Sequence, residues 1–403
     1  MSRGDDKKGS QSYYSQHFSH DNKSDIDSKF SGPPLTYSSV GVDRTMREKS
    51  RKSISALIGK EATAYAQGSP IELPFGFVFP FERGSRSYLD LQIEGVGTKT
   101  LLAELAGDYR SIGIDAVAMA ANDVIRSGAK PILMSDAIHV ARSEPSKIAS
   151  IIAGVREGAK LSGALLCSGE TGDVAEILHA PYKRSALPFD IFVSVLGTVD
   201  RGNVVYGRIS KGDVVIAMES SGIHSNGLTL ARKILLKNWG GVYEPDERPA
   251  GLGRKLIAEL LEPTRIYVGP LLEAMEKSRI KAAIHITGDG FFKFGRLIEF
   301  QRKISRTVGE IGFKFDSLGP LPSIYRLLEG AAEESKHPIS RKEMFRTFNM
   351  GFGFAVVVSK EQEETVVSSF RRWFPARRIG TVTPNRSILL EGAGKDGETI
   401  VFR

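Results

Sequence analysis

Predicted β-strands alternate with predicted helices along almost the whole chain, and this alternation constrains the fold more than any other feature. Ser87–Glu94 alternates polar and apolar residues, which is typical of a half-buried strand. A helix that begins at Asp115 then leads to a strand over 132–140. The next helix begins at Pro145 and ends at Gly163. Because both halves of the chain show this alternation, we expect an α/β or α+β fold.

The chain divides into a polar N-terminal segment and two halves of similar construction. Residues 1–36 are rich in Ser, Asp and Lys and almost free of large aliphatic side chains, so we expect a disordered tail. Composition turns glycine-rich and polar over 201–213, and we place the boundary there, between domains at 37–205 and 206–403. The further elements are expected as strands at 165–166, 189–199, 214–218, 282–286 and 353–358, and as helices at about 228–237, 264–277 and 322–334.

The formal net charge of +8 has two interpretations. A nucleic-acid-binding protein uses Lys and Arg to neutralise phosphates, whereas an enzyme with small phosphorylated substrates uses the same charge to attract them. The basic residues are spread along the chain and no RNA- or DNA-binding motif is visible. We therefore favour an enzyme and expect no nucleic-acid partner.

Cysteine content and the apolar pattern bear on the compartment. The chain has one cysteine, Cys167, so no intrachain disulfide can form, which suits a reducing environment. No neighbouring histidine or basic residue marks Cys167 as a nucleophile, and we interpret it as structural. No apolar run approaches the roughly 20 residues that a membrane span requires. We expect a cytoplasmic protein without a membrane partner.

Polar and glycine residues gather directly after predicted strands, where ligands bind in open α/β folds. These clusters lie at 94–99, 168–171, 220–227 and 287–290. In the loop Gly95-Val-Gly-Thr-Lys99 the glycines would let backbone N–H groups approach an anion, and Lys99 would supply a charge for a phosphate. The loop is neither a Walker A sequence nor a dinucleotide-binding loop, so a tight turn with a surface lysine is the alternative.

Acidic residues also converge on this region. Asp115 and Asn122 are seven residues apart, which returns nearly to the same helix face, with Asp123 beside them. Glu94 and Glu170 lie at neighbouring strand ends. Magnesium prefers oxygen ligands, typically one or two carboxylates shared with substrate phosphates, so a magnesium–nucleotide complex would explain the convergence. A plain helix N-cap is the alternative role for Asp115.

Two histidines could serve chemistry or structure. His224 lies among small hydrogen-bonding residues in Ser220–Gly227, a loop that could hold a phosphate or amide and move a proton, although a lone loop histidine is often structural. His285 lies inside an apolar strand and is equally well interpreted as a core histidine. No His/Cys spacing indicates zinc.

From about Tyr37 to the C-terminus the chain closely resembles one family, phosphoribosylformylglycinamidine cyclo-ligase, also called aminoimidazole ribonucleotide synthetase. The resemblance rests on short motifs in a fixed order. In the first half these are Tyr37–Asp43, Gly95–Lys99, Gly113–Asp115, Asn122-Asp123 and Gly169–Thr171. In the second half they are Ser221–Gly227, Arg232-Lys233, Pro263–Val268, His285–Gly288 and Phe345–Gly351.

The resemblance implies two α/β domains with the active site in the cleft between them, and a homodimer in which the first domains' sheets meet in a barrel-like core. It implies a reaction that starts from formylglycinamidine ribonucleotide and ATP. ATP phosphorylates the formyl oxygen, and the amidine nitrogen attacks the activated carbon, which closes the imidazole ring and releases ADP and phosphate. Because the nucleophile is in the same molecule, ring closure benefits from a high effective concentration.

The resemblance also implies roles for individual residues. Magnesium would be held by Glu94, Asp115 and Asp123. The nucleotide would be bound by Glu94, Gly95, Gly97, Thr98, Lys99, Asp115, Asn122, Asp123, Gly169 and Thr171. Glu170, His224 and Asn226 would meet the substrate or the transferred phosphate.

The chain departs from the family pattern at several of these places. Glu94 stands where the family usually has Asp, and Asp289 replaces a glycine of the usual Thr-Gly-Gly-Gly. Ser55 stands where a lysine is expected in the first helix, and one expected acid is displaced to Asp173 or Glu176. Two rival hypotheses follow: another ATP-using member of the superfamily that phosphorylates a different small acceptor, or a non-catalytic descendant that binds nucleotide or a partner.

Overall fold

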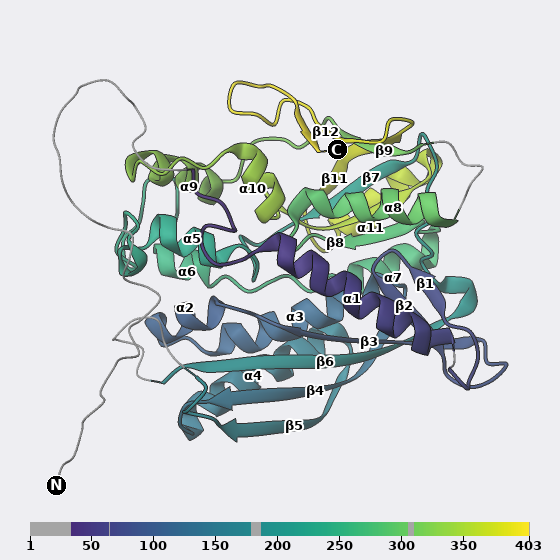
Figure 1. Cartoon of the computed structure of the whole chain (residues 1–403), viewed down its shortest axis with the longest axis horizontal. Helices are drawn as coiled ribbons and strands as arrows, with labels where there is room; N and C mark the ends of the chain where they lie inside the picture. The colour runs from purple at the N-terminus through teal and green to yellow at the C-terminus, as the bar shows by residue number, and fades with distance from the viewer. Residues whose placement is uncertain (1–33, 64, 179–186, 305–309, 403) are drawn as a thin grey trace, which may run out of the picture.

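Two mixed sheets form the framework of the protein, one from each half of the chain, and the first helix lies across the region between them (Figure 1). The computed structural model describes residues 34–402, apart from residue 64 and the segments 179–186 and 305–309. The expected tail falls outside the described residues except for 34–36, where the Leu35 backbone N–H donates to the Pro338 carbonyl oxygen.

The first sheet has six strands, and its middle is antiparallel. In spatial order the strands are β1 (Ile71–Leu73), β2 (Gly76–Pro80), β3 (Ser87–Gly95), β6 (Phe189–Asp200), β4 (Lys130–Val140) and β5 (Leu165–Asp173). Only the edge pair β4–β5 runs parallel within the described part of this sheet. The strands expected at 87–94, 132–140 and 189–199 are therefore present with nearly the expected bounds.

Helices α3 (Arg110–Ile125) and α4 (Pro145–Ser162) pack against each other beside this sheet. Their axes approach so closely that a Cβ at Gly113 would lie 2.2 Å from the Ile151 carbonyl oxygen, and one at Gly154 would lie 1.9 Å from the Arg110 carbonyl oxygen. Glycine is required here for close approach rather than for a turn.

The start of α3 and the segment after Leu166 correct two expectations. Because α3 begins at Arg110, Asp115 lies inside the helix and is not its N-cap. The prediction placed the helix start too late because Gly113 is a poor helix former. The glycine is present because α4 packs closely against it. Residues Ser168–Thr171 belong to strand β5 and are not a loop after it. Pairing with β4 extends the strand through this glycine-containing stretch.

The second sheet has seven strands and holds the larger aromatic core. In spatial order they are β13 (Ile400–Phe402), β12 (Ile388–Leu390), β9 (Gly312–Phe315), β11 (Ala376–Thr383), β7 (Val214–Glu219), β10 (Phe352–Val358) and β8 (Ala282–His285). Every residue of β10 is buried, as expected for a central strand covered on both faces. Helix α11 (Glu363–Arg371) packs against β7 and β11, and α7 (Val268–Lys277) packs against α11.

The other helices surround the second sheet or connect the halves. They are α1 (Arg44–Thr63), α2 (Lys99–Ala106), α5 (Leu228–Leu235), α6 (Leu256–Leu260), α8 (Gly295–Ile304), α9 (Ser323–Glu334) and α10 (Arg341–Thr347), with short 3-10 helices η1 (Arg201–Asn203), η2 (Lys237–Trp239), η3 (Gly290–Phe294) and η4 (Lys360–Gln362). Residues 264–267, expected as helix, precede α7 without joining it. None of the helices in the described part of the chain is both long and apolar enough to cross a membrane.

The N-terminal end of α1 contacts the second half of the chain. The Arg44 guanidinium forms an ion pair with Glu343 at 2.8 Å and donates to the Thr347 hydroxyl at 2.7 Å. The Tyr37 backbone N–H donates to the same Glu343 carboxylate at 3.0 Å. These contacts fix α1 beside α10, so that α1 closes one side of the space between the sheets (Figure 1).

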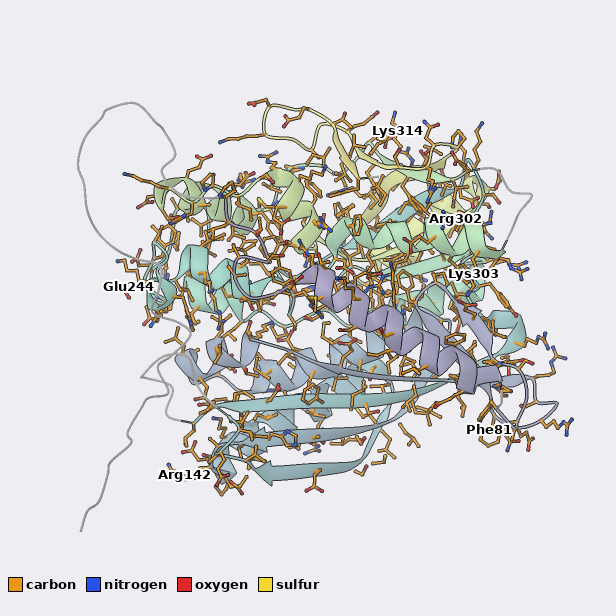
Figure 2. The ribbon with its side chains drawn as sticks, viewed as in Figure 1. Phe81, Arg142, Glu244, Arg302, Lys303 and Lys314 are labelled. Carbon is orange, nitrogen blue, oxygen red and sulfur yellow. The ribbon has the colours of Figure 1, made fainter. Side chains whose placement is uncertain are left out.

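In β3 the face that carries polar residues is buried, and the face that carries apolar residues is exposed to solvent. Tyr88 and Asp90 are buried, whereas Leu91 and Ile93 are 65% and 66% exposed. Leu165 on β5 is 64% exposed, and Leu133 and Phe192 are also exposed. Among the described residues, the first sheet therefore has an apolar face that no other element covers. The charged side chain of Arg142 lies at the edge of the first half of the chain (Figure 2).

Candidate active site

A cleft of about 700 Å³ lies between α1, the first sheet with α3, and the segment 287–296. It is the place where polar groups from both halves of the chain converge. Its wall includes Tyr37, Arg44, Arg47, Phe75, Gln92, Glu94, Asp123, Arg126, Asn226, Asp289, Lys293 and Arg296. Three of the expected site residues, Glu94, Asp123 and Asn226, are therefore brought together in one cavity.

Two of the carboxylates that line the cleft, Glu94 and Asp123, are expected site residues. Glu94 lies at the end of β3, and burial raises its pKa to about 7, with a further contribution from the negative charge of Asp123. Asp123 lies near the end of α3 and is ion-paired with Arg126 at 2.7 Å. Burial alone would raise the pKa of Asp123, but Arg126, Lys293 and His285 hold it below its usual range. The cleft therefore offers one firmly ionised carboxylate and one that titrates near neutrality.

His285 and Lys293 approach these acids from the second half of the chain. The His285 Nδ1 lies 2.9 Å from an oxygen of Asp123. Burial lowers the pKa of His285, so the ring is neutral at pH 7 and Nδ1–H donates to the carboxylate. Lys293 on η3 is 6% exposed, and its ammonium donates to the His285 carbonyl oxygen and the Thr287 hydroxyl. His285 is thus a buried histidine that orients an acid of the cleft.

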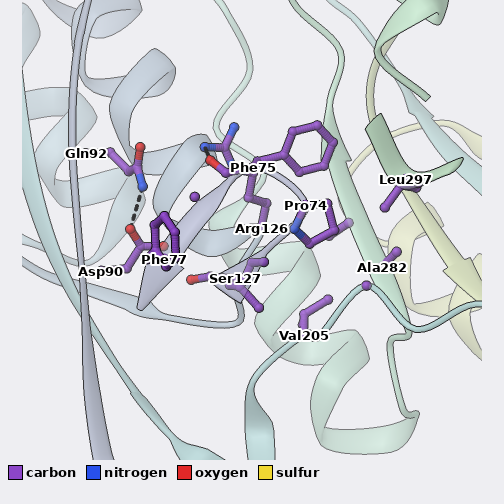
Figure 3. Close-up of a pocket in the computed structure, with 14 residues that line it drawn as sticks. Pro74, Phe75, Phe77, Asp90, Gln92, Arg126, Ser127, Val205, Ala282 and Leu297 are labelled. Carbon is purple, nitrogen blue, oxygen red and sulfur yellow. Dashed lines mark hydrogen bonds between the residues drawn. The ribbon is translucent and has the colours of Figure 1, made fainter. Parts of the chain in front are cut away.

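A small cavity (Figure 3) shares Phe75, Gln92 and Arg126 with the lining of the cleft. Arg126 donates to the Phe75 carbonyl oxygen at 3.2 Å. In the small cavity the Gln92 amide donates to the buried Asp90 carboxylate at 2.5 Å. Its volume of about 10 Å³ is close to what one water molecule needs. The larger cleft, and not this cavity, has room for a nucleotide.

Lys99 and Asp115 do not line this cleft, and their expected roles in binding phosphate and metal stay predictions. Their side chains are fully buried and form an ion pair at 2.6 Å. Lys99 also donates to the Glu262 carbonyl oxygen, and Asp115 accepts hydrogen bonds from Thr264 and Ser225. The pair joins α2 and α3 to the second half of the chain. Among the described residues no group of three or more acids, histidines or cysteines is arranged to hold a metal, so the expected three-carboxylate cluster is not formed.

Asn122 and His224 are also buried and engaged in structure. The Asn122 amide donates to the Arg265 carbonyl oxygen and accepts from the Tyr267 backbone N–H. His224 is 3% exposed and has a φ of 65°, an unusual conformation for a residue other than glycine. Its Nε2 accepts from the Ser221 backbone N–H at 3.1 Å, and burial lowers its pKa well below the usual range. A neutral His224 therefore shapes the loop that carries Asn226 into the cleft.

The remaining expected residues do not line the cleft. Gly169, Glu170 and Thr171 are exposed on β5, the edge strand of the first sheet, and line no part of the cleft in the single chain. Thr98 lies 2.8 Å, hydroxyl to hydroxyl, from Thr229 across the two halves. Gly97 has a φ of 55°, which glycine adopts without strain.

Gly95 was an expected site residue and has a packing role, whereas Lys293 lines the cleft and was not expected there. A Cβ at Gly95 would lie 3.0 Å from the Ile191 carbonyl oxygen and from the Phe192 ring, so this glycine serves strand packing as well as the loop. Lys293 was not among the expected site residues. The available signal was a lone lysine inside the aromatic run Phe291-Phe-Lys-Phe294, where a buried cation needs a functional or structural reason.

Comparison with known proteins gives a consistent result. Residues 78–199 match the family described as AIR synthase related protein, N-terminal domain, and residues 210–391 match the corresponding C-terminal domain. The chain is 34% identical to the phosphoribosylformylglycinamidine cyclo-ligase of Thermococcus gammatolerans over 89% of this chain and 99% of the relative. It is 34% identical to that of Pyrococcus furiosus over 89% and 98%.

Among solved structures, T. maritima PurL complexed with AMPPCP is similar in fold. The TM-score is 0.52 at 14% identity, covering 81% of this chain and 44% of that chain. At this identity the likeness supports the fold alone. The sequence matches extend over both halves of the chain, and the chain therefore belongs to the phosphoribosylformylglycinamidine cyclo-ligase family.

Proposed function

We propose that this protein catalyses the ATP-dependent cyclisation of formylglycinamidine ribonucleotide to aminoimidazole ribonucleotide, with release of ADP and phosphate, in purine biosynthesis. The observation that carries the proposal is the cleft in which Glu94, Asp123 and Asn226 meet basic side chains from both halves of the chain. Its volume of about 700 Å³ lies within the range of small-molecule sites.

Glu94 and Asp123 fit a magnesium ion, and we assign them as its protein ligands in place of the three-acid set. Magnesium binds through one or two carboxylates together with substrate phosphates and water, so a third acid is not required. When bound, the ion would neutralise charge on the nucleotide phosphates. His285 donates to one Asp123 oxygen and Arg126 to the other, so this carboxylate is held in one orientation and stays ionised.

The protein's own groups position the reactants. Arg44, Arg47 and Arg296 place positive charge around the cleft, which suits a nucleoside triphosphate and a ribonucleotide that both carry phosphates. The Asn226 amide reaches the cleft from the second half, where it can bind the formyl or amidine group. Phosphorylation of the formyl oxygen converts it into a leaving group, and holding the amidine nitrogen close to the activated carbon accelerates closure.

We also propose a homodimer formed through the uncovered face of the first sheet. Leu91, Ile93 and Leu165 are each at least 64% exposed on this face, and a contiguous apolar surface of this kind marks a protein–protein contact. The lone cysteine, Cys167, is exposed on β5 at the same sheet, in keeping with a cytoplasmic location where thiols stay reduced. We retain the division into domains at 37–205 and 206–403, which agrees with the separation of the two sheets.

The test is direct. The purified protein is incubated with formylglycinamidine ribonucleotide, ATP and magnesium, and aminoimidazole ribonucleotide and ADP are measured. We expect product from the wild type and a loss of at least about 100-fold in kcat for Asp123→Asn, as for removal of a transition-state electrostatic group. Lys255→Met, at an exposed surface ion pair, is the control and should retain full activity.

Two results would contradict the proposal. ADP release with another acceptor and none with this ribonucleotide would identify a different kinase-like reaction. Nucleotide binding without turnover of any acceptor would identify a non-catalytic descendant.

A further inference from the structure

Lys293 differs from the other basic residues of the cleft. Among the described residues it is the one basic residue lining the cleft that is buried. Arg126 is paired with Asp123, Arg296 with Asp289 and Arg44 with Glu343. In the described part of the chain no carboxylate lies within 4.0 Å of the Lys293 ammonium.

The hydrogen bonds of Lys293 use two of the three N–H donors of its ammonium. Its Nζ donates to the His285 carbonyl oxygen at 2.9 Å and to the Thr287 hydroxyl at 2.8 Å. Both acceptors are neutral, and an ammonium has three N–H donors. One N–H donor therefore remains for a group in the cleft that Lys293 lines.

The surroundings favour an anion at this place. The Lys293 Nζ lies 5.5 Å from the centre of the Phe75 ring, and the guanidinium carbons of Arg126 and Arg296 lie 5.1 Å and 5.9 Å from the same centre. These are favourable cation–π contacts, and Arg126 and Arg296 are also ion-paired with Asp123 and Asp289. Among the described residues Lys293 is the one of these three cations without an ion pair, so it has room for an anionic ligand. Burial lowers the pKa of Lys293 to about 8, while Asp123 opposes this shift.

We propose that Lys293 is a catalytic residue whose ammonium contacts a phosphoryl oxygen of the ligand in the cleft. The proposal rests on the function proposed above. Because Lys293 stands beside the acids assigned to the metal–nucleotide complex, the γ-phosphoryl group of ATP is the favoured source, and the 5′-phosphate of the ribonucleotide is the other.

Lys293 forms no covalent bond in this role. In the step it assists, the bond between the γ-phosphorus and the bridging oxygen breaks, a bond from that phosphorus to the formyl oxygen forms, and ADP departs with the electron pair. The ammonium stabilises the charge on the phosphoryl oxygens during transfer, as basic side chains do in other phosphoryl-transfer sites. Since Lys293 comes from the second half of the chain and Glu94 from the first, the contact also joins the two halves around the ligand.

The test compares ligands that differ by one phosphoryl group. Dissociation constants of the full-length wild type, Lys293→Met and Lys293→Gln for MgATP and MgADP are measured by calorimetry, without ribonucleotide. Lys303→Met is the matched control, because Lys303 lies at the periphery (Figure 2) and its side chain is 63% exposed. Circular dichroism and thermal unfolding establish that each variant is folded.

A contact to the γ-phosphoryl group predicts that both Lys293 variants bind MgATP at least about 10-fold more weakly, bind MgADP as the wild type does, and lose roughly 100-fold in kcat. A contact to the 5′-phosphate predicts normal nucleotide binding and a raised KM for the ribonucleotide. Equal losses for ATP and ADP, or no loss for any ligand, would show that Lys293 only supports the turn at Thr287 and would overturn the proposal. Because the binding arms need no turnover, they remain informative even if the wild type forms no product.

Discussion

Replacement of Lys99 by Met tests whether this lysine binds phosphate or holds the two halves of the chain together. In the structure its ammonium is fully buried, lies 2.6 Å from Asp115, and donates to the Glu262 carbonyl oxygen at 2.8 Å. Methionine fills much the same volume but removes the charge and both contacts. The Asp115 carboxylate would keep its hydrogen bonds from Thr264 and Ser225 and lose its counter-charge.

The expected cost follows from the burial of both partners. Removing one member of a buried ion pair costs roughly 3–5 kcal/mol, because the other charge remains in a poorly solvated place. For a domain of about 150–250 residues, each kcal/mol lowers the unfolding temperature by about 2–4 °C. We therefore expect Lys99→Met to unfold roughly 6–20 °C below the wild type. Asp115→Asn should behave similarly, and the double variant should lose less than the sum of the two because the charges are coupled.

Thermal and urea unfolding followed by circular dichroism measure this effect. The control is Lys255→Met, which breaks an ion pair with Asp246 at 2.8 Å in which both side chains are at least 50% exposed. Such a surface pair contributes about 0–1 kcal/mol. If Lys99→Met were as stable as the wild type and instead bound MgATP more weakly, the structural role would be refuted and the phosphate-binding role implied by the motif would stand.

Three further predictions concern packing, protonation and assembly. Gly154→Ala should destabilise the protein by several times the cost of Gly202→Ala in urea unfolding, because its Cβ would lie 1.9 Å from a carbonyl oxygen whereas Gly202 has open space. In the ligand-free protein the pKa of Glu94 is raised to about 7 from an ordinary 4.5. Between these two pH values the folded state therefore binds more protons than the unfolded state. The contribution of Glu94 to the free energy of unfolding thus falls as the pH rises from about 5 to 7. Glu94→Gln should make the free energy of unfolding depend less on pH in this range. An unchanged pH dependence would contradict the raised pKa of Glu94. Ile93→Asp should convert the dimer to a monomer in sedimentation analysis, while Leu161→Asp, at a residue 58% exposed on α4, should leave it intact; a monomeric wild type would refute the proposed assembly.

The strand at Ser87–Glu94 and the helix from Pro145 to Gly163 were predictable because periodicity and end signals agree there. The strand ends at Gly95 and the helix is closed by Gly163 in a left-handed conformation. The start of α3 was not predictable, since Gly113 opposes helix formation locally and is retained for contact with α4. Which face of β3 is buried was also not predictable. The alternation of polar and apolar residues is visible in the sequence, but which face is covered depends on the rest of the fold.

The candidate site divides in the same way. Glu94, Asp123 and Asn226 were predictable because they occur in motifs that follow strands or end a helix, and the cleft brings them together. Lys293 was missed because it lies in a run of phenylalanines, where no spacing or motif marks it. Lys99 was assigned to phosphate because a glycine loop with a lysine is a common phosphate-binding pattern.

The sequence by itself determined the alternation of strands and helices, the two-part organisation and the family, because these depend on local periodicity and on the order of short motifs. The tertiary structure decided which acids share a cavity and which are paired with cations. Asp115 and Asp123 lie on one helix, yet the first is neutralised by Lys99 under the junction of the halves and the second faces the cleft. The contact of Asp123 with His285, and those of Asp115 with Thr264 and Ser225, join residues more than a hundred positions apart, which no local pattern contains.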